Sequence, residues 1–91
     1  MASDILNAMK LAKYVKFRQE KFGAVLFETR SEKVFTLNPT ASAVVREIQA
    51  GGDEAAVLLR LGEQFQGDGG AIAREAAAYI ADLRKMGLVE D

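Results

Sequence analysis

The chain has 91 residues, of which 49% are hydrophobic and 27% are charged, the composition of one small folded domain. The net charge is −1, and cysteine and histidine are absent, which excludes disulfides, most metal sites and most nucleophile–base pairs. No apolar run reaches the ~20 residues of a membrane span, and no signal peptide opens the sequence. We expect a cytoplasmic domain with no membrane segment and no cofactor.

Positive charge gathers in the first half of the chain. Residues 1–45 carry seven basic and four acidic side chains, whereas residues 46–91 carry five and nine. The basic residues nearest the N-terminus are Lys10, Lys13, Lys16, Arg18 and Lys21. This pattern is typical of a solvated strand face with lysines at an edge, and the alternative is attraction of an acidic partner.

The N-terminal half predicts a short helix and then three strands. Ser3 can cap a helix over Asp4 to Leu11, so we treat residues 1–12 as an N-terminal extension of a domain that spans residues 13–91. Period-two alternation then marks strands over residues 14–18, 23–29 and 33–37. Their tight connections favour an antiparallel meander.

The C-terminal half predicts three helices. Asn38 is a good N-cap and Pro39 suits the first helical position, so the third strand passes into a helix without a loop. Glycines at 51–52 end this helix, and Asp53 caps the second. The third helix runs from about residue 71 to 86. The fold class is therefore α+β, winged helix-turn-helix-like, with a three-stranded antiparallel sheet followed by three helices.

Such folds host unrelated functions, of which DNA binding is one. A recognition helix needs several base-reading side chains in its first turns, but the third helix begins "GGAIAREAAAY", with one arginine soon followed by Glu75. We therefore expect no nucleic-acid partner. A winged-helix DNA-binding regulator stays as the alternative, and a bare interaction or dimerisation module is a third interpretation.

No group of residues in the sequence supports catalysis. The acidic residues near the turns lack partners that would mark an acid–base pair. The stretch "GDGG" at residues 67–70 lacks the lysine and Ser/Thr of a P-loop and does not follow a strand. The sequence predicts a protein that is not an enzyme.

The segments "EKFGAVLFETRSEKVFTLNPTASAVVREIQAGG" and "AAAYIADLRKMGLVED" resemble the PqqD family of small peptide chaperones, also called RiPP recognition elements. The resemblance covers about residues 13–89 and depends on the order and spacing of many features. These include glycine at 23 opening a strand, Leu37-Asn38 before a helix and the glycine pair that ends it.

The resemblance implies a non-catalytic chaperone in natural product biosynthesis. Such a protein binds the leader of a ribosomally made precursor peptide and presents it to a modifying enzyme, often a radical S-adenosylmethionine protein. The leader would add as a strand beside the third strand, in the cleft against the last helix. The edge residues are then Lys33, Val34, Phe35, Thr36 and Leu37. The precursor, the modifying enzyme and the choice between monomer and homodimer stay open.

The third helix offers a candidate wall for this cleft. Ala73, Ala77 and Ala81 recur every four residues beside the predicted core stripe, with Arg84 near the same line. A helix surface of small alanine side chains would leave room for a strand with bulky side chains. The alternative is that alanine is simply a good helix former on a solvent face.

Overall fold

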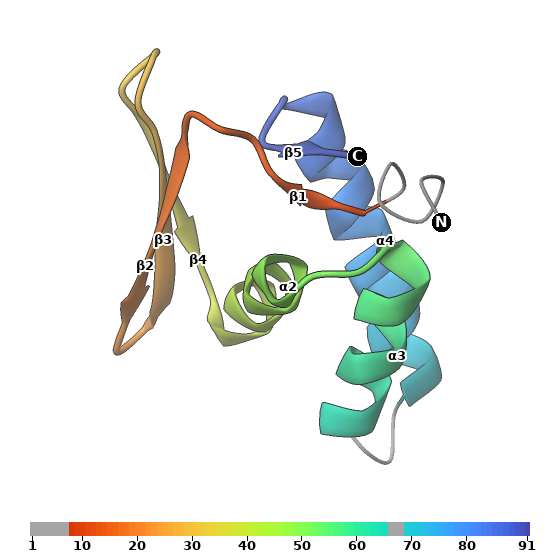
Figure 1. The fold of residues 1–91 in the computed structure, drawn as a ribbon. Coiled ribbons are helices and arrows are strands. Elements are labelled where there is room, and N and C mark those ends of the chain that lie inside the picture. The colour runs from red at the N-terminus through yellow and green to blue at the C-terminus, as the bar shows by residue number, and fades with distance from the viewer. Residues whose placement is uncertain (1–7, 66–68) are drawn as a thin grey trace.

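The computed structural model describes residues 8–65 and 69–91 (Figure 1). It confirms the predicted α+β fold, with a three-stranded antiparallel sheet followed by three helices. The elements in chain order are β1 (Lys10–Leu11), β2 (Val15–Glu20), β3 (Gly23–Glu28), β4 (Lys33–Leu37), α2 (Pro39–Ala50), α3 (Glu54–Gln64), α4 (Gly69–Lys85) and β5 (Val89–Glu90).

The sheet has the strand order β2-β3-β4, so β4 is an edge strand. Its register pairs Leu26 with Phe35 and Ala24 with Leu37, and alternate residues point to opposite faces. Leu37 is only 4% exposed and faces the core, whereas Val34 is 59% exposed on the outer face. The predicted division of this strand into two faces is confirmed.

The passage from β4 into α2 is made by an N-cap, as predicted. The backbone N–H of Ala41 donates to Oδ1 of Asn38 at 2.8 Å, and Pro39 is the first helical residue. Asp53 caps α3 in the same way, accepting from the N–H of Ala56 at 2.9 Å. Each cap satisfies a backbone donor that the first turn of a helix leaves free.

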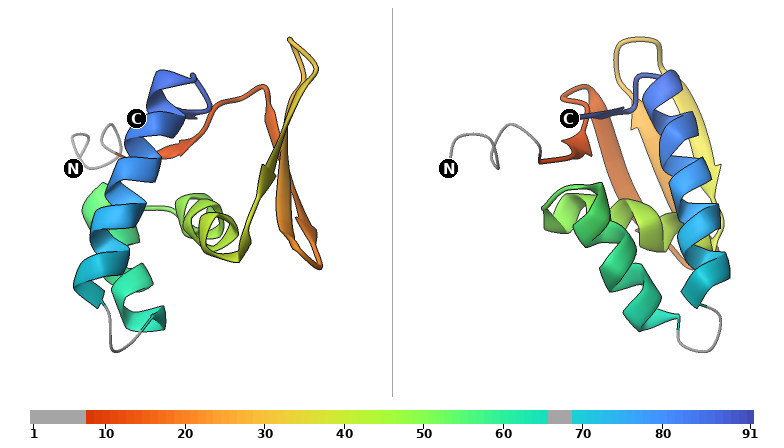
Figure 2. Two further views of the ribbon diagram at one scale, coloured as in Figure 1. Left: turned by 180° about the vertical axis from the view of Figure 1, so that it is seen from behind. Right: turned by 90° about the vertical axis from the view of Figure 1, so that its right-hand side faces the viewer.

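The sheet and α4 lie on opposite sides of the molecule, with α2 between them (Figures 1 and 2). The largest buried side chains come from every layer and form one core: Met9, Leu26, Val44, Val45, Ile48, Val57, Leu61, Ile80, Leu83 and Leu88. α4 packs against α3, α2 and β5, and α2 packs against the sheet. α2 therefore connects two layers that do not pack closely on one another.

The N-terminal segment differs from the prediction. A helix was expected over Asp4 to Leu11; residues 1–7 lie outside the described residues, and the following residues form β1, paired antiparallel with β5. Met9 is 1% exposed, and its N–H donates to the carbonyl oxygen of Gly52 at 3.0 Å. Residues 9–12 therefore pack in the fold, through contacts with the far end of the chain.

In residues 8–65 and 69–91, no helix combines the length and apolarity that crossing a membrane requires. The same ranges contain no group of three carboxylate side chains arranged to hold a metal ion.

Candidate functional site

The sheet has two edge strands, β2 and β4, and a groove lies beside the edge of β4. β4 pairs with β3 on one side, and within the described residues no strand lies on its other side. An edge strand presents a row of backbone N–H and C=O groups that another extended segment can pair with. The edge is short, because β4 spans only Lys33–Leu37.

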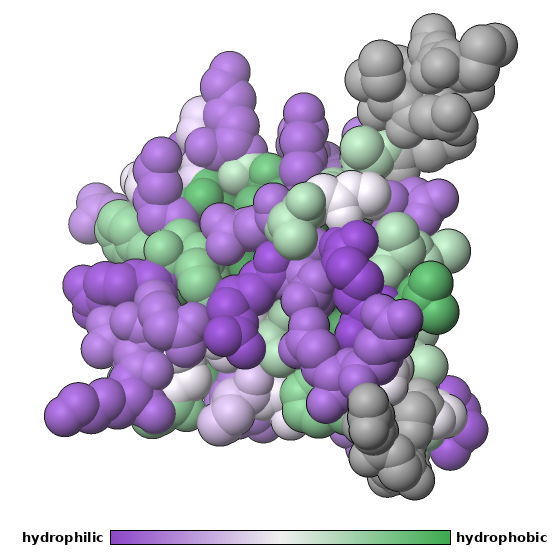
Figure 3. Space-filling view, turned by 60° about the horizontal axis from the view of Figure 1, so that its bottom comes forward, coloured by the Kyte–Doolittle hydropathy of each residue, from purple (hydrophilic) through white to green (hydrophobic). Residues whose placement is uncertain are grey.

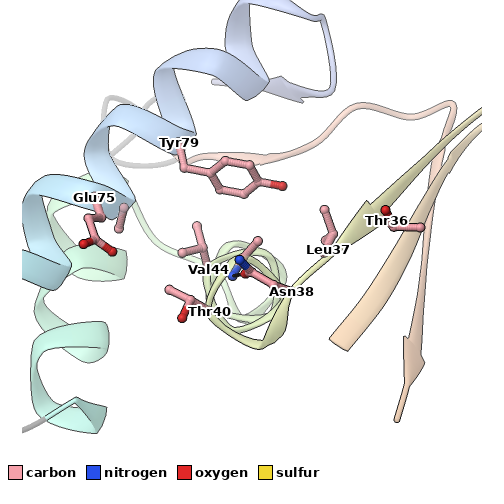
Figure 4. Close-up of a pocket in the computed structure, with 9 residues that line it drawn as sticks. Thr36, Leu37, Asn38, Thr40, Val44, Glu75 and Tyr79 are labelled. Atoms are coloured by element: carbon pink, nitrogen blue, oxygen red, sulfur yellow. Dashed lines mark hydrogen bonds between the residues drawn. The ribbon is translucent and has the colours of Figure 1, made fainter. Parts of the chain in front are cut away.

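A groove of about 370 Å³ runs beside the C-terminal end of this edge (Figure 4). β4 and α4 form its walls, and the first turns of α2 form its floor. Its lining residues are Thr36, Leu37, Asn38, Thr40, Ala41, Val44, Glu75, Ala76 and Tyr79. The groove exists because α4 packs on α3 and β5 and leaves a gap toward β4.

A second hollow of about 260 Å³ lies toward the N-terminal end of β4. Its lining residues are Glu28, Ser31, Lys33, Phe35, Met86 and Leu88, so it lies between the sheet and the segment that follows α4. Phe35 and Leu88 supply apolar surface, whereas Lys33 supplies a cation. The two hollows together follow the length of the β4 edge.

The polar groups of the two hollows are in different environments. Burial raises the pKa of the Tyr79 hydroxyl, and the nearby charge of Asp82 raises it further. Hydrogen bonds from the Ser31 side chain and from the backbone of Arg30 and Ser31 lower the pKa of Glu28 to about 2. The Tyr79 hydroxyl is therefore neutral, and Glu28 is an ionised carboxylate committed to its turn.

The structure brings four of the five predicted β4 residues to these hollows. Lys33 and Phe35 line the smaller hollow, and Thr36 and Leu37 line the larger groove. Val34 lies on the outer face of the sheet, in a shallow apolar patch with Lys16, Arg18, Val25 and Phe27.

Hydrophilic side chains dominate the face seen in Figure 3, with smaller hydrophobic patches between them.

The four predicted α4 residues lie elsewhere. Arg84 points to α3 and the C-terminus, with its guanidinium 2.6 Å from the Glu54 carboxylate and 2.8 Å from that of Asp91. Helical spacing places Ala73 and Ala77 near the same face, where both are half-buried, while Ala81 is exposed. Among the described residues, the linings of the two hollows include none of these four.

The groove wall on α4 is formed instead by Glu75, Ala76 and Tyr79. None of these three residues was among the predicted peptide-binding positions. The sequence did contain a signal for this wall. Tyr79 lies at the margin of the apolar stripe of the helix and Glu75 lies four residues before it, a pattern typical of a half-exposed helix face. Peptide contact at Ala73, Ala77, Ala81 and Arg84 stays a prediction, and our proposal below uses the observed wall.

The fold and the groove together define a small α+β domain with an open sheet edge beside a helix. The family model for coenzyme PQQ synthesis protein D (PqqD) matches residues 23–89, which is more than half of the chain. The chain belongs to the PqqD family, as its sequence resemblance indicated.

Two solved structures are similar to this chain. One is described as lasso peptide synthetase B1 complexed with the leader peptide; it is 25% identical, with a TM-score of 0.75 over 91% of this chain and 98% of that chain. The other, TbiB1 in complex with the TbiA(beta) leader peptide, is 16% identical, with a TM-score of 0.77 over 89% and 94%. The second likeness shows the fold. No curated protein sequence matches at a significant level.

Proposed function

We propose that this chain is a non-catalytic chaperone that binds the leader of a ribosomally made precursor peptide and presents it to a modifying enzyme. The observation that carries the proposal is the free edge of β4 facing a groove whose opposite wall is α4. A peptide strand can pair with Lys33–Leu37 and direct alternate side chains into the two hollows. Edge pairing holds the peptide, and the hollows select its side chains.

Simple energetics agree with binding of moderate strength. Each backbone hydrogen bond contributes about 0.5–1.5 kcal/mol net, and each buried aliphatic anchor about 1.5–3 kcal/mol. Ordering a disordered leader costs on the order of 2–5 kcal/mol, and lost rigid-body freedom costs more. A dissociation constant in the micromolar range follows, with the anchors dominating specificity because backbone pairing is nearly blind to sequence.

The two similar structures support the proposal, since both are described as complexes with leader peptides. The modifying enzyme we propose is a radical S-adenosylmethionine protein or another peptide-modifying enzyme. The outer face of the sheet carries exposed Phe27 and Val34, and no helix within residues 8–65 and 69–91 packs over it (Figure 1). An enzyme can therefore approach the bound strand from that side while the groove is filled.

The alternative of a DNA-binding regulator is not favoured by any feature of the described residues. On α4, the exposed cation Arg74 is followed directly by the exposed carboxylate of Glu75. Asp82, further along the helix, is also exposed. Carboxylates on the presented helix repel the phosphate backbone on which non-specific affinity for DNA depends.

Calorimetric titration with the leader of a precursor encoded beside this chain tests the proposal. Thr40→Trp should fill the groove and weaken binding by at least about tenfold, because Thr40 lines the groove floor. Ala81→Trp is the matched control on the exposed side of α4 and should bind as the wild type does. If Thr40→Trp binds normally and Ala81→Trp does not, the site is on the other face of α4.

A further inference from the structure

The two ends of the β4–α4 groove carry opposite charge. At the Leu37 end, Glu75 lines the groove, and its carboxylate has no ion pair among the described residues. Among the described residues that line this end of the groove, none is a Lys or Arg, so Glu75 makes the local electrostatic potential negative.

The Lys33 end is the reverse. Two ionisable side chains line the smaller hollow, Glu28 and Lys33. The Glu28 carboxylate accepts the backbone N–H groups of Arg30 and Ser31 at 2.8 and 3.0 Å, and the Arg30 guanidinium lies 3.5 Å from it. The negative charge of Glu28 is thus offset within its own turn by Arg30, and Lys33 is the cation in the lining of this hollow.

Strand geometry relates these charges to positions on a bound peptide. Lys33, Phe35 and Leu37 alternate with Val34 and Thr36, so the first three share the inner side of β4. At about 3.3 Å per residue, Lys33 and Leu37 are roughly 13 Å apart. A peptide strand added to this edge would set three inward side chains opposite these positions, each two residues from the next.

We propose that the groove selects a leader segment by charge order: a basic residue, an apolar residue two positions later and an acidic residue two positions after that. The basic side chain lies at Glu75, the apolar one in the hollow of Phe35, Met86 and Leu88, and the acidic one at Lys33. The inference rests on the proposed function and names the class of peptide that the same site takes.

The direction of the strand determines that order. Every pairing in the β2-β3-β4 sheet is antiparallel, and an antiparallel ladder is slightly more stable per residue than a parallel one. In an antiparallel addition, the peptide residue opposite Leu37 precedes the residue opposite Lys33. The basic residue therefore comes first in the peptide, and a segment with reversed charges meets like charges at both ends.

Two synthetic peptides with identical flanking residues test the proposal. One carries Lys-Thr-Leu-Thr-Glu and the other Glu-Thr-Leu-Thr-Lys, and NMR titration measures both affinities at low salt. Because an exposed ion pair changes affinity by about 1.5- to 5-fold, two pairs should make the lysine-first peptide bind about 2- to 25-fold tighter. The ratio should fall toward one at high salt.

A protein variant with exchanged charges tests whether Glu75 and Lys33 cause this preference. The double variant Glu75→Lys and Lys33→Glu should prefer the glutamate-first peptide by a similar factor. The control double variant Glu63→Lys and Lys13→Glu makes the same net change at exposed positions outside the groove, and it should keep the wild-type preference.

Equal affinities for the two peptides, or an unchanged preference in the swapped variant, would overturn the charge order but not leader binding. A wild-type preference for the glutamate-first peptide would overturn the strand direction, and failure of both peptides to bind would also count against the inference. The natural leader, titrated in parallel against wild type and Thr40→Trp, reports on the proposed function separately, because filling the groove should weaken its binding whichever charge order the two synthetic peptides reveal.

Discussion

Gly23 at the start of β3 lies directly against the carbonyl oxygen of Leu37 at the end of β4. A Cβ on Gly23 would meet this oxygen, and next the backbone of Asn38, at separations that real side chains do not adopt. The backbone of Gly23 also has φ +147°, a conformation that residues with side chains rarely take. The missing side chain therefore sets the place where β4 ends and α2 begins, which is one end of the groove.

Gly23→Ala should destabilise the domain by more than the roughly 1–3 kcal/mol that backbone strain alone costs, because a steric clash with Leu37 adds to the strain. Gly51→Ala is the matched control, since Gly51 has φ +108° but nothing lies where its Cβ would stand. Urea denaturation of both variants gives the two losses. Equal losses would show that the contact between Gly23 and Leu37 does not constrain the fold.

The two faces of β4 predict opposite outcomes for one substitution. Leu37→Asp should leave no cooperative unfolding transition, because it buries an unpaired carboxylate at a core position. Val34→Asp places the same carboxylate on the exposed outer face and should change the free energy of unfolding by less than about 0.5 kcal/mol. Thermal unfolding followed by circular dichroism distinguishes them. Similar behaviour of the two variants would contradict the observed register of β4.

The two helix caps allow stability to be separated from binding. Asn38→Ala and Asp53→Ala each remove one cap hydrogen bond and should each cost about 0.5–2 kcal/mol in denaturant titrations. Only Asn38 lines the groove, so only its loss should also weaken leader binding. A parallel loss of affinity in Asp53→Ala would mean that affinity follows global stability.

The turn between β3 and β4 should respond to acid through Glu28. Hydrogen bonds from the Ser31 side chain and the Arg30 and Ser31 backbone lower its pKa in the folded protein to about 2, below the ordinary value of 4.5. The unfolded chain therefore binds the proton more tightly, so the contribution of Glu28 is present above pH 4.5 and is lost as the pH falls toward 2.

Glu28→Gln should accordingly flatten the acid side of the stability curve in that interval and leave the shape of the curve above pH 5 unchanged. Urea midpoints measured from pH 2 to pH 7 give both curves. Identical slopes below pH 4.5 in wild type and Glu28→Gln would contradict the assigned hydrogen bonds.

Local patterns predicted most of the fold, because the signals are contained within a few residues. Asn38 and Pro39 mark a helix start from their own chemistry, and alternation alone separates Phe35 and Leu37 from Val34. The β1–β5 pairing was missed because Leu11 meets Val89 from the other end of the chain. Each of these strands has only two residues, which is too short for an alternating pattern that would predict their pairing.

The site was predicted in part, for a related reason. The β4 edge follows from strand order, which the meander predicted, but the orientation of α4 about its axis depends on packing against α3. Arg84 pairs with Glu54 of α3, and the α4 residues that line the groove beside β4 are Glu75, Ala76 and Tyr79. A regular alanine repeat predicts that one face of a helix carries small side chains. It does not predict which neighbouring element packs against that face.

Pairing of a leader peptide with the free edge of β4 can be observed in the amide chemical shifts measured during a leader titration. The largest shifts should fall on residues 33–37 and on Glu75 and Tyr79 across the groove. Amides of the outer β2 edge should move little. If the largest shifts instead cluster on β2 or α3 while the β4 amides stay in place, pairing at this edge is contradicted.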